Sequence, residues 1–146
     1  MSLVTMDMLV KRAWADGSCI PAFNVGSLEM IRGAIRAAEE LDKPLIIQIA
    51  ERLLKYSPLE YIGPAMVNAA KAAKVDVAVN MDHSSSFDVI EEALELGFTS
   101  VMYDGSTDSY EDNIIGTRKA YELASKYGAS VEGELGLVGG SEDGLS

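Results

Sequence analysis

Short apolar runs alternate with helical patterns along this sequence. The runs cover residues 20–25, 44–49, 76–81, 99–103 and 129–134, and several are rich in valine and isoleucine. Between them, apolar residues recur every three or four positions, as they do on one face of an amphipathic helix. Strands that are apolar on both faces and separated by helices form parallel sheets covered by those helices. The alternation therefore predicts an α/β fold.

The helical patterns have recognisable ends. Ser27 is placed to cap the second helix, and Pro58 suits the first turn of the third. Gly97 and Gly128 follow the fourth and fifth patterns, where glycine favours a helix end. We expect helices over residues 3–15, 28–41, 58–74, 87–96 and 109–127. The first of these precedes every strand, and residues 135–146 form a polar tail rich in glycine.

Charge and cysteine content exclude some classes of partner. The 146 residues include 12 basic and 23 acidic ones, for a net charge of −11. Such a charge repels phosphate backbones and anionic lipid surfaces, so we expect neither nucleic acid nor membrane as a partner. A small anionic ligand is still compatible, because local amides and metal ions hold it. Cys19 is the single cysteine, so no intrachain disulfide is possible and a cytoplasmic location is expected.

Polar residues gather where the predicted strands end. The set comprises Asn24, Gln48, Asp82, His83, Asp104, Glu132 and Glu134. Any one of them could be a helix cap or a loop polar group. In a (β/α)8 TIM barrel, however, these strand ends converge on one face, and that face carries the active site. The set favours a barrel over an open doubly wound sheet, and no G-x-G-x-x-G turn follows the first strand.

His83, the only histidine, is a candidate metal ligand. It lies between Asp82 and three serines at the end of a predicted strand. Imidazole suits zinc and similar divalent ions. A catalytic zinc usually has three protein ligands, so either acids such as Asp104 and Glu134 complete the site or further ligands lie beyond Ser146. Asp82 and these acids could alternatively carry protons.

Five motifs in order resemble a known family. They are Pro21-Ala22-Phe23-Asn24-Val25, Met81-Asp82-His83, Val101-Met102-Tyr103-Asp104-Gly105-Ser106, Val131-Glu132-Gly133-Glu134-Leu135-Gly136 and Gly139-Gly140-Ser141-Glu142-Asp143-Gly144. Their order and spacing are similar to those of the class II, zinc-dependent fructose-bisphosphate and tagatose-bisphosphate aldolases. Each motif is weak alone, but the resemblance runs over essentially the whole chain. It implies that residues 1–146 are the N-terminal part of one aldolase barrel domain, supplying a leading helix and about the first five strands.

The resemblance also implies a reaction and a metal. The family reversibly cleaves a ketose 1,6-bisphosphate to dihydroxyacetone phosphate and glyceraldehyde 3-phosphate, a step in carbohydrate metabolism and glycolysis. His83 matches the first of three zinc-ligand histidines. Asp104 and Glu134 match residues that hold the metal in a more buried position. We expect Zn²⁺ as the cofactor, with a second divalent ion and a monovalent cation left open, and a homo-oligomer, either a dimer or a tetramer.

The same matching assigns catalytic and substrate-binding roles. Asp82 matches the acid/base that protonates the aldehyde oxygen in the condensing direction. Glu142 matches an acid on a mobile loop that helps move the proton at the carbon beside the ketone. Asn24 matches an amide that contacts substrate, and we expect Gln48 to bind substrate as well.

One departure leaves the substrate open. The family commonly has serine or threonine after the second strand, near the far phosphate, where this chain has Ile49-Ala50-Glu51-Arg52. Fructose bisphosphate, tagatose bisphosphate and a less usual ketose phosphate therefore all stay candidates. The other two zinc histidines and the glycine-rich phosphate site of the family would lie beyond residue 146, so the chain alone is expected to be inactive.

Three alternatives compete with this interpretation. A Schiff-base aldolase needs a lysine at the catalytic end of a strand, whereas Lys43 and Lys74 precede the second and third strands. Another metal-dependent barrel lyase would use the same acids and histidine. The chain could also be a non-catalytic half-barrel that serves as an assembly or interaction unit.

Overall fold

A five-stranded parallel sheet forms the centre of the chain. The computed structural model describes residues 2–136. The strands are β1 (Ala22–Asn24), β2 (Leu45–Ala50), β3 (Val77–Ser84), β4 (Ser100–Tyr103) and β5 (Ser130–Gly133), and they pair in the order of the sequence. Sequential order in a parallel sheet, with a helix in each connection, is the arrangement of a (β/α)8 barrel. The predicted α/β class is confirmed.

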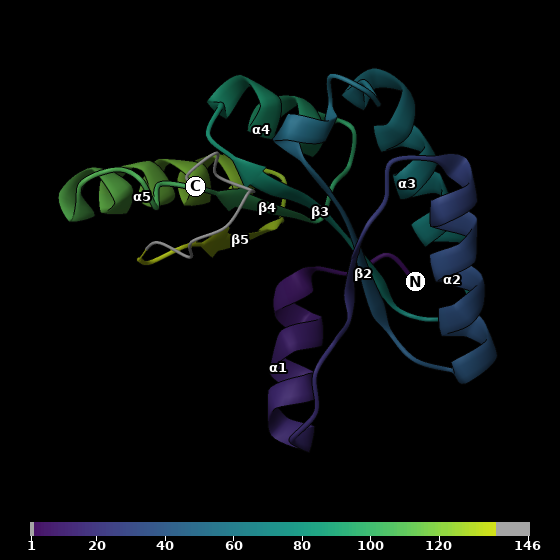
Figure 1. Cartoon of the computed structure of the whole chain (residues 1–146). Coiled ribbons are helices and arrows are strands. Elements are labelled where there is room, and N and C mark those ends of the chain that lie inside the picture. The colour runs from purple at the N-terminus through teal and green to yellow at the C-terminus, as the bar shows by residue number, and fades with distance from the viewer. Residues whose placement is uncertain (1, 137–146) are drawn as a thin grey trace.

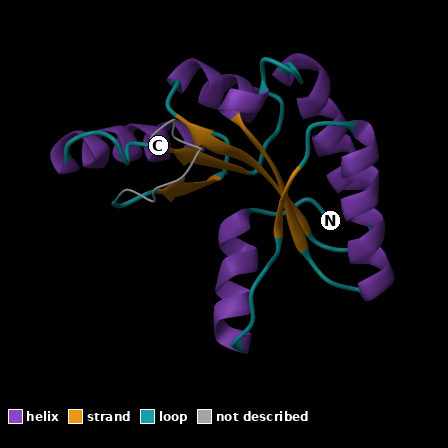
Figure 2. Cartoon of the chain, in the orientation of Figure 1, coloured by secondary structure: helices purple, strands orange, loops and turns teal. Residues whose placement is uncertain are grey.

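Helices cover one face of this sheet (Figures 1 and 2). The helices α2 (Leu28–Leu41), α3 (Leu59–Ala72), α4 (Phe87–Glu95) and α5 (Tyr110–Ser125) follow the first four strands, and a short 3-10 turn, η1 (Glu51–Leu53), follows β2. The remaining helix, α1 (Met6–Asp16), lies on the other side of the sheet from α2 and α3 (Figure 1). None of the helices in residues 2–136 combines the length and apolar character that crossing a membrane requires.

Alternation along the strands separates two apolar layers. Ile47, Val79 and Val101 belong to the cluster that packs against the covering helices. Ile46 and Ala78 point the other way and pack against Leu9 of α1. Successive strand residues face opposite sides, so the first set is the outer face of a barrel wall and the second is its inner face. Because Ile46 and Ala78 lie early in their strands, α1 covers the amino ends of the inner face and leaves the carboxyl ends open.

The structure corrects the predicted start of the first helix. The helix expected from Leu3 begins at Met6, with the hydroxyl of Thr5 accepting a hydrogen bond from the backbone of Met8. Leu3 instead forms an isolated parallel bridge with Val77, and the amide of Val4 donates to the carbonyl of Val77 at 2.9 Å. Apolar spacing cannot distinguish this extended segment from a first helical turn, because only the partner strand decides it.

Strand β3 is longer than the sequence predicts. The run of apolar residues ends at Met81, but the strand continues through Ser84. Its register against β4 shifts between Met81 and Ser84. A local irregularity of this kind re-aims side chains and is common beside active sites. The polar end of β3 is therefore part of the sheet rather than a loop.

The open sheet edges lead to a prediction about the isolated chain. A polypeptide limited to these 146 residues should self-associate, because β1 and β5 are edge strands of the described sheet and the Phe23 side chain is 49% exposed on β1. Sedimentation velocity and light scattering at several concentrations would measure this. A monomer that persists at the highest concentration would contradict the prediction.

Candidate active site

The inner face changes from apolar to polar toward the carboxyl ends of the strands. One register row contains Asn24, Gln48, Asn80, Ser100 and Ser130, which are successive partners across all five strands. In-register neighbours in a parallel sheet point to the same face. The row lies one step beyond Ile46 and Ala78, so a band of amides and hydroxyls separates the layer under α1 from the strand ends.

Asp82 lies directly above this band, on the inner face of β3. It is only 6% exposed, and its Oδ2 atom accepts a hydrogen bond from Nε2 of Gln48 at 3.0 Å. Gln48 is on β2, whose last residue, Ala50, is the register partner of Asp82. The structure thus brings together a predicted proton carrier and a predicted substrate ligand. An amide donor fixes the orientation of the carboxylate without neutralising its charge.

The position of His83 depends on the irregular end of β3. Simple alternation would send its side chain to the face opposite Asp82. Its backbone instead has φ of 43°, in the left-handed region, next to the register shift. Histidine tolerates this region better than most non-glycine residues. The imidazole consequently reaches Asp104, with 2.8 Å between Nδ1 and Oδ2.

His83, Asp104 and Glu134 form a cluster that could hold a metal ion. One donor atom from each lies within 4.8 Å of the others, and Nδ1 of His83 is 3.7 Å from Oε2 of Glu134. An imidazole nitrogen with two carboxylates is a donor set that zinc and similar divalent ions accept, so the residues fit the predicted cofactor. The second oxygen of Asp104 accepts from the backbone and the hydroxyl of Ser106, at 3.1 and 2.6 Å. These bonds orient the carboxylate, as outer-shell contacts do in metal sites.

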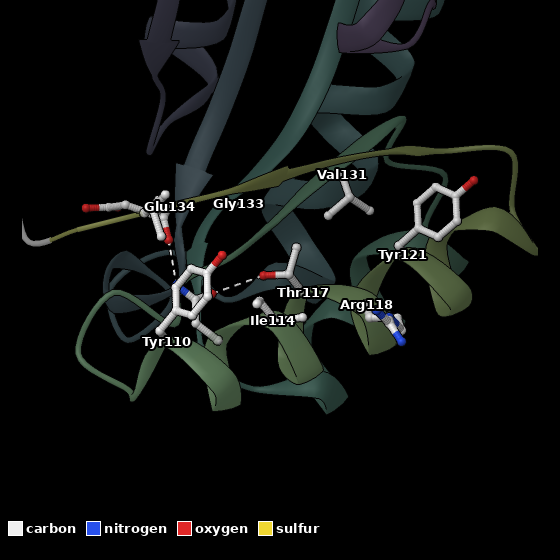
Figure 3. A pocket seen from close by; sticks show the side chains of 10 residues that line it. Tyr110, Ile114, Thr117, Arg118, Tyr121, Val131, Gly133 and Glu134 are labelled. Atoms are coloured by element: carbon white, nitrogen blue, oxygen red, sulfur yellow. Dashed lines mark hydrogen bonds between the residues drawn. The ribbon is translucent and has the colours of Figure 1, made fainter.

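Glu134 is held through its backbone. The side-chain amide of Asn113, a buried residue of α5, donates to the carbonyl of Glu134 at 2.7 Å. Thr117 in turn donates its hydroxyl to Oδ1 of Asn113 at 3.1 Å, and both bonds are drawn as dashed lines in Figure 3. Gly105 leaves the space that Asn113 needs, because a Cβ at position 105 would lie 2.7 Å from Oδ1 of Asn113. Helix α5 therefore sets where the last acid of the cluster lies.

A pocket between α5 and β5 shares Glu134 with this cluster but is otherwise lined by different residues. It has a volume of about 540 Å³ and is lined by residues that include Tyr110, Ile114, Thr117, Tyr121 and Val131 (Figure 3). Val131 packs with the helix-covered core, so the pocket lies on the outer face of β5. The acids converge instead on the inner face, where a second hollow of about 380 Å³ reaches Gln48 and Glu132.

The electrostatics of the cluster favour a cation. Burial lowers the pKa of His83, but the hydrogen bond that its imidazole donates to Asp104 and the charges of Asp82, Asp104 and Glu134 outweigh this effect, so the pKa is raised. The pKa of Asp104 is lowered overall. Burial would raise it, but the hydrogen bonds that Asp104 accepts from Ser106 and His83 have the larger effect. Desolvation and the charge of Asp82 raise the pKa of Glu132. These carboxylates repel one another and stabilise positive charge between them.

Two inner-face residues, Asn80 and Ser100, were not singled out by the sequence interpretation as site residues. Asn80 and Ser100 are fully buried, and among residues 2–136 their Oδ1 and Oγ atoms are the buried side-chain atoms without a hydrogen-bond partner. Asn80 donates from Nδ2 to Oε2 of Glu132 at 3.5 Å. The sequence did contain a signal for Asn80 and Ser100, since each is a polar residue at an inward-facing position of an otherwise apolar strand. A search limited to the ends of the strands misses such positions.

The structure brings together some of the predicted site residues but not all of them. The structure brings Gln48 to Asp82, and His83 to Asp104 and Glu134. Asn24 is in register with Gln48 on the inner face and is exposed there. Glu142, with its glycine-rich motif, lies outside the described residues. Lys43 and Lys74 precede β2 and β3, at the end of the sheet opposite the cluster, which agrees with the argument against a Schiff-base aldolase.

A parallel strand-helix wall with candidate metal ligands at the carboxyl ends of its strands is the arrangement found in metal-dependent barrel enzymes. The family model for fructose-bisphosphate aldolase class-II matches residues 4–146. The chain belongs to the class II fructose-bisphosphate aldolase family.

Individual relatives agree with this assignment. The chain is 40% identical to a Bacillus subtilis protein named probable fructose-bisphosphate aldolase, over 98% of this chain and 51% of the relative. It is 38% identical to the fructose-bisphosphate aldolase of Thermus caldophilus, over 97% and 46% of the two chains. The crystal structure of the YdjI aldolase from Escherichia coli K12 superimposes with a TM-score of 0.88 at 34% identity, covering 92% of this chain and 51% of that one. The chain therefore spans about half the length of the relatives it matches, as expected for part of a barrel.

The raised pKa of His83 predicts how metal affinity depends on pH. The imidazole must lose its proton to bind a metal, so the apparent zinc affinity should fall about tenfold per pH unit below its pKa. Because that pKa is raised, the loss should begin at a higher pH than for an ordinary histidine ligand. Chelator competition across the range in which histidine titrates would measure it, with His83→Gln as the control. An affinity that is independent of pH in this range would contradict the assignment of His83.

Proposed function

We propose that the complete protein containing this chain is a metal-dependent aldolase. It would reversibly cleave a ketose 1,6-bisphosphate to dihydroxyacetone phosphate and glyceraldehyde 3-phosphate. The observation that carries the proposal is the convergence of the His83, Asp104 and Glu134 donor atoms within 4.8 Å, beside the buried Asp82. Family membership over residues 4–146 supports the type of reaction.

We propose Zn²⁺ as the ion that this cluster binds. His83 would be a ligand in every state, with Asp104 and Glu134 as ligands of a more buried position. When bound, such an ion supplies Lewis-acid stabilisation of the negative charge that develops on the substrate during carbon–carbon cleavage. His83 is the only histidine in these 146 residues. We therefore assign the remaining zinc ligands to histidines further along the complete protein. Whether a second divalent ion or a monovalent cation joins it is left to metal analysis.

Asp82 is proposed as the residue that transfers the proton. In the cleavage direction it would take the proton from the hydroxyl that becomes the aldehyde, and in condensation it would return it to the aldehyde oxygen. The amide of Gln48, 3.0 Å from Oδ2, supports a fixed orientation for this carboxylate. Asn24 and Gln48 are proposed to bind substrate from the inner face. Glu142 is proposed to move the proton at the carbon beside the ketone.

The substrate is proposed to be fructose 1,6-bisphosphate, with tagatose 1,6-bisphosphate as the alternative. The names of the relatives from Bacillus subtilis and Thermus caldophilus support the first. The segment Ile49-Ala50-Glu51-Arg52 at the end of β2 offers no hydroxyl for the far phosphate. This chain would therefore bind that phosphate through groups other than the serine or threonine common in the family. Comparison of kcat/KM for the two epimeric sugars in the complete protein would decide between them.

The remaining expectations concern the context of this reaction. Residues 1–146 are proposed to be the N-terminal part of a single barrel domain, inactive without the strands that follow in a complete barrel. The complete protein is proposed to form a homo-oligomer, either a dimer or a tetramer. It is also proposed to be cytoplasmic and to act in carbohydrate metabolism. A sugar phosphate is the small-molecule partner.

Replacing Asp82 tests the proton-transfer role. Asp82→Ala in the complete protein should lower kcat by ~10² or more, the scale of lost general acid/base catalysis. Metal content should be unchanged, because the cluster of His83, Asp104 and Glu134 is intact. Asp88→Ala, at an exposed carboxylate in the first turn of α4, is the matched control. Cleavage by Asp82→Ala at close to the wild-type rate would remove Asp82 from the mechanism.

Replacing His83 tests the metal site. His83→Ala should lose stoichiometric zinc and aldol cleavage together, since a metal ligand supports both. Metal analysis after gel filtration and a coupled assay of triose phosphate release would follow the two properties. A variant that keeps one equivalent of zinc would reject His83 as a ligand.

A further inference from the structure

One carboxylate outside the cluster holds the backbone that carries His83. Glu51 lies in η1, directly after β2. Its Oε2 atom accepts three hydrogen bonds from the end of β3 and the two residues after it: from the hydroxyl of Ser84 at 2.7 Å, the amide of Ser85 at 2.9 Å and the amide of Ser86 at 3.1 Å. Residues more than 30 positions apart in the sequence are thereby joined at the site.

These donors form an anion-binding turn at the start of a helix. Ser86 is the N-cap of α4, and its hydroxyl accepts from the amide of Val89 at 3.4 Å. Amides at a helix start carry partial positive charge and favour a carboxylate. Hydrogen bonds to an ionised oxygen are stronger than those between neutral groups. Glu51 supplies that anion from within the protein.

The segment held by Glu51 begins at the residue after His83. His83 has a backbone φ of 43°, a conformation that residues with a Cβ atom rarely adopt without support from the surrounding structure. From the opposite side, the amide of Asp104 donates to the carbonyl of Ser84 at 2.9 Å. Ser84 is therefore fixed by η1 through its hydroxyl and by β4 through its backbone. Removing the first of these contacts leaves the left-handed turn with less support.

We infer that Glu51 is a positioning residue, which keeps His83 in the backbone conformation that points its imidazole at Asp104 and Glu134. The inference rests on the proposed metal site. It assigns a structural role at the site to an acid in the segment where the family commonly has serine or threonine. The carboxylate acts through the loop of Ser84, Ser85 and Ser86 and not on the reacting atoms.

Two replacements of Glu51 separate geometry from charge. Glu51→Ala removes the acceptor, whereas Glu51→Gln keeps an oxygen that can accept the same bonds. A matched control is Glu39→Ala, because Oε1 of Glu39 accepts from the amide of Lys74 at 2.9 Å, at the opposite end of the sheet. Each variant is made in the complete protein. Zinc affinity is measured by chelator competition, and the loop is followed by amide hydrogen exchange of residues 84–86.

Glu51→Ala should lose protection at residues 84–86 and bind zinc at least ~10-fold more weakly, the usual effect of losing an outer-shell contact. Glu51→Gln should recover most of both properties, and Glu39→Ala should change neither. A Glu51→Ala variant that loses loop protection but keeps wild-type zinc affinity would overturn the inference. So would a Glu51→Gln variant as defective in zinc affinity as Glu51→Ala, because charge rather than loop geometry would then be at work.

A metal-independent measurement distinguishes this inference from the proposed function. The ring nitrogens of His83, assigned by the signals that His83→Gln lacks, report the hydrogen bond to Asp104 in metal-free protein. Glu51→Ala should shift them toward values of an unbonded imidazole. If the wild-type protein takes up no metal, the proposed site fails, but a shifted His83 signal still supports the positioning role. An unchanged signal in Glu51→Ala would refute it, whatever the metal content.

Discussion

In-register parallel pairing of β2, β3 and β4 is the constraint on which the site depends. It places Gln48 and Asn80 in one row of the inner face, with Asp82 one step beyond and within reach of Gln48. The same pairing buries Ile47 and Val79 under the outer helices. Burial on that side holds the strands in register, since a slip by one residue would exchange the two faces. Packing on the outer face thus sets the order of polar groups on the inner one.

Departure from regular pairing at the end of β3 adds His83 to the candidate metal site on this ordered face. The register shift between Met81 and Ser84, with the left-handed backbone of His83, allows Asp82 and His83 to contribute to one site although they are sequence neighbours in a strand. Contacts from η1 and β4 stabilise that irregular backbone. Strain is thereby confined to a few residues that other elements support, as is common at functional sites.

Negative charge then determines what the site can hold. Asp82, Asp104 and Glu134 all act on the imidazole of His83 and raise its pKa, and the raised pKa of Glu132 reflects the charge of Asp82 after the effect of burial. Carboxylates this close favour a bound cation, which relieves their repulsion and competes with the proton on His83. Ser106 and Asn113 orient the cluster through Asp104 and Glu134.

Much of this could be predicted from the sequence. Apolar runs alternating with helical patterns determined the parallel sheet, and five motifs in order identified the family, because both are local patterns along the chain. The gathering of Gln48, Asp82, His83 and Asp104 at one end of the sheet follows from the strand-end positions that a barrel requires, but their individual hydrogen bonds do not. The start of α1, the buried Asn80 and Ser100, and the left-handed turn at His83 could not be predicted in this way. Nor could the role of Glu51, because its three hydrogen bonds join segments more than 30 residues apart, and only the tertiary structure decides which distant donors a carboxylate meets.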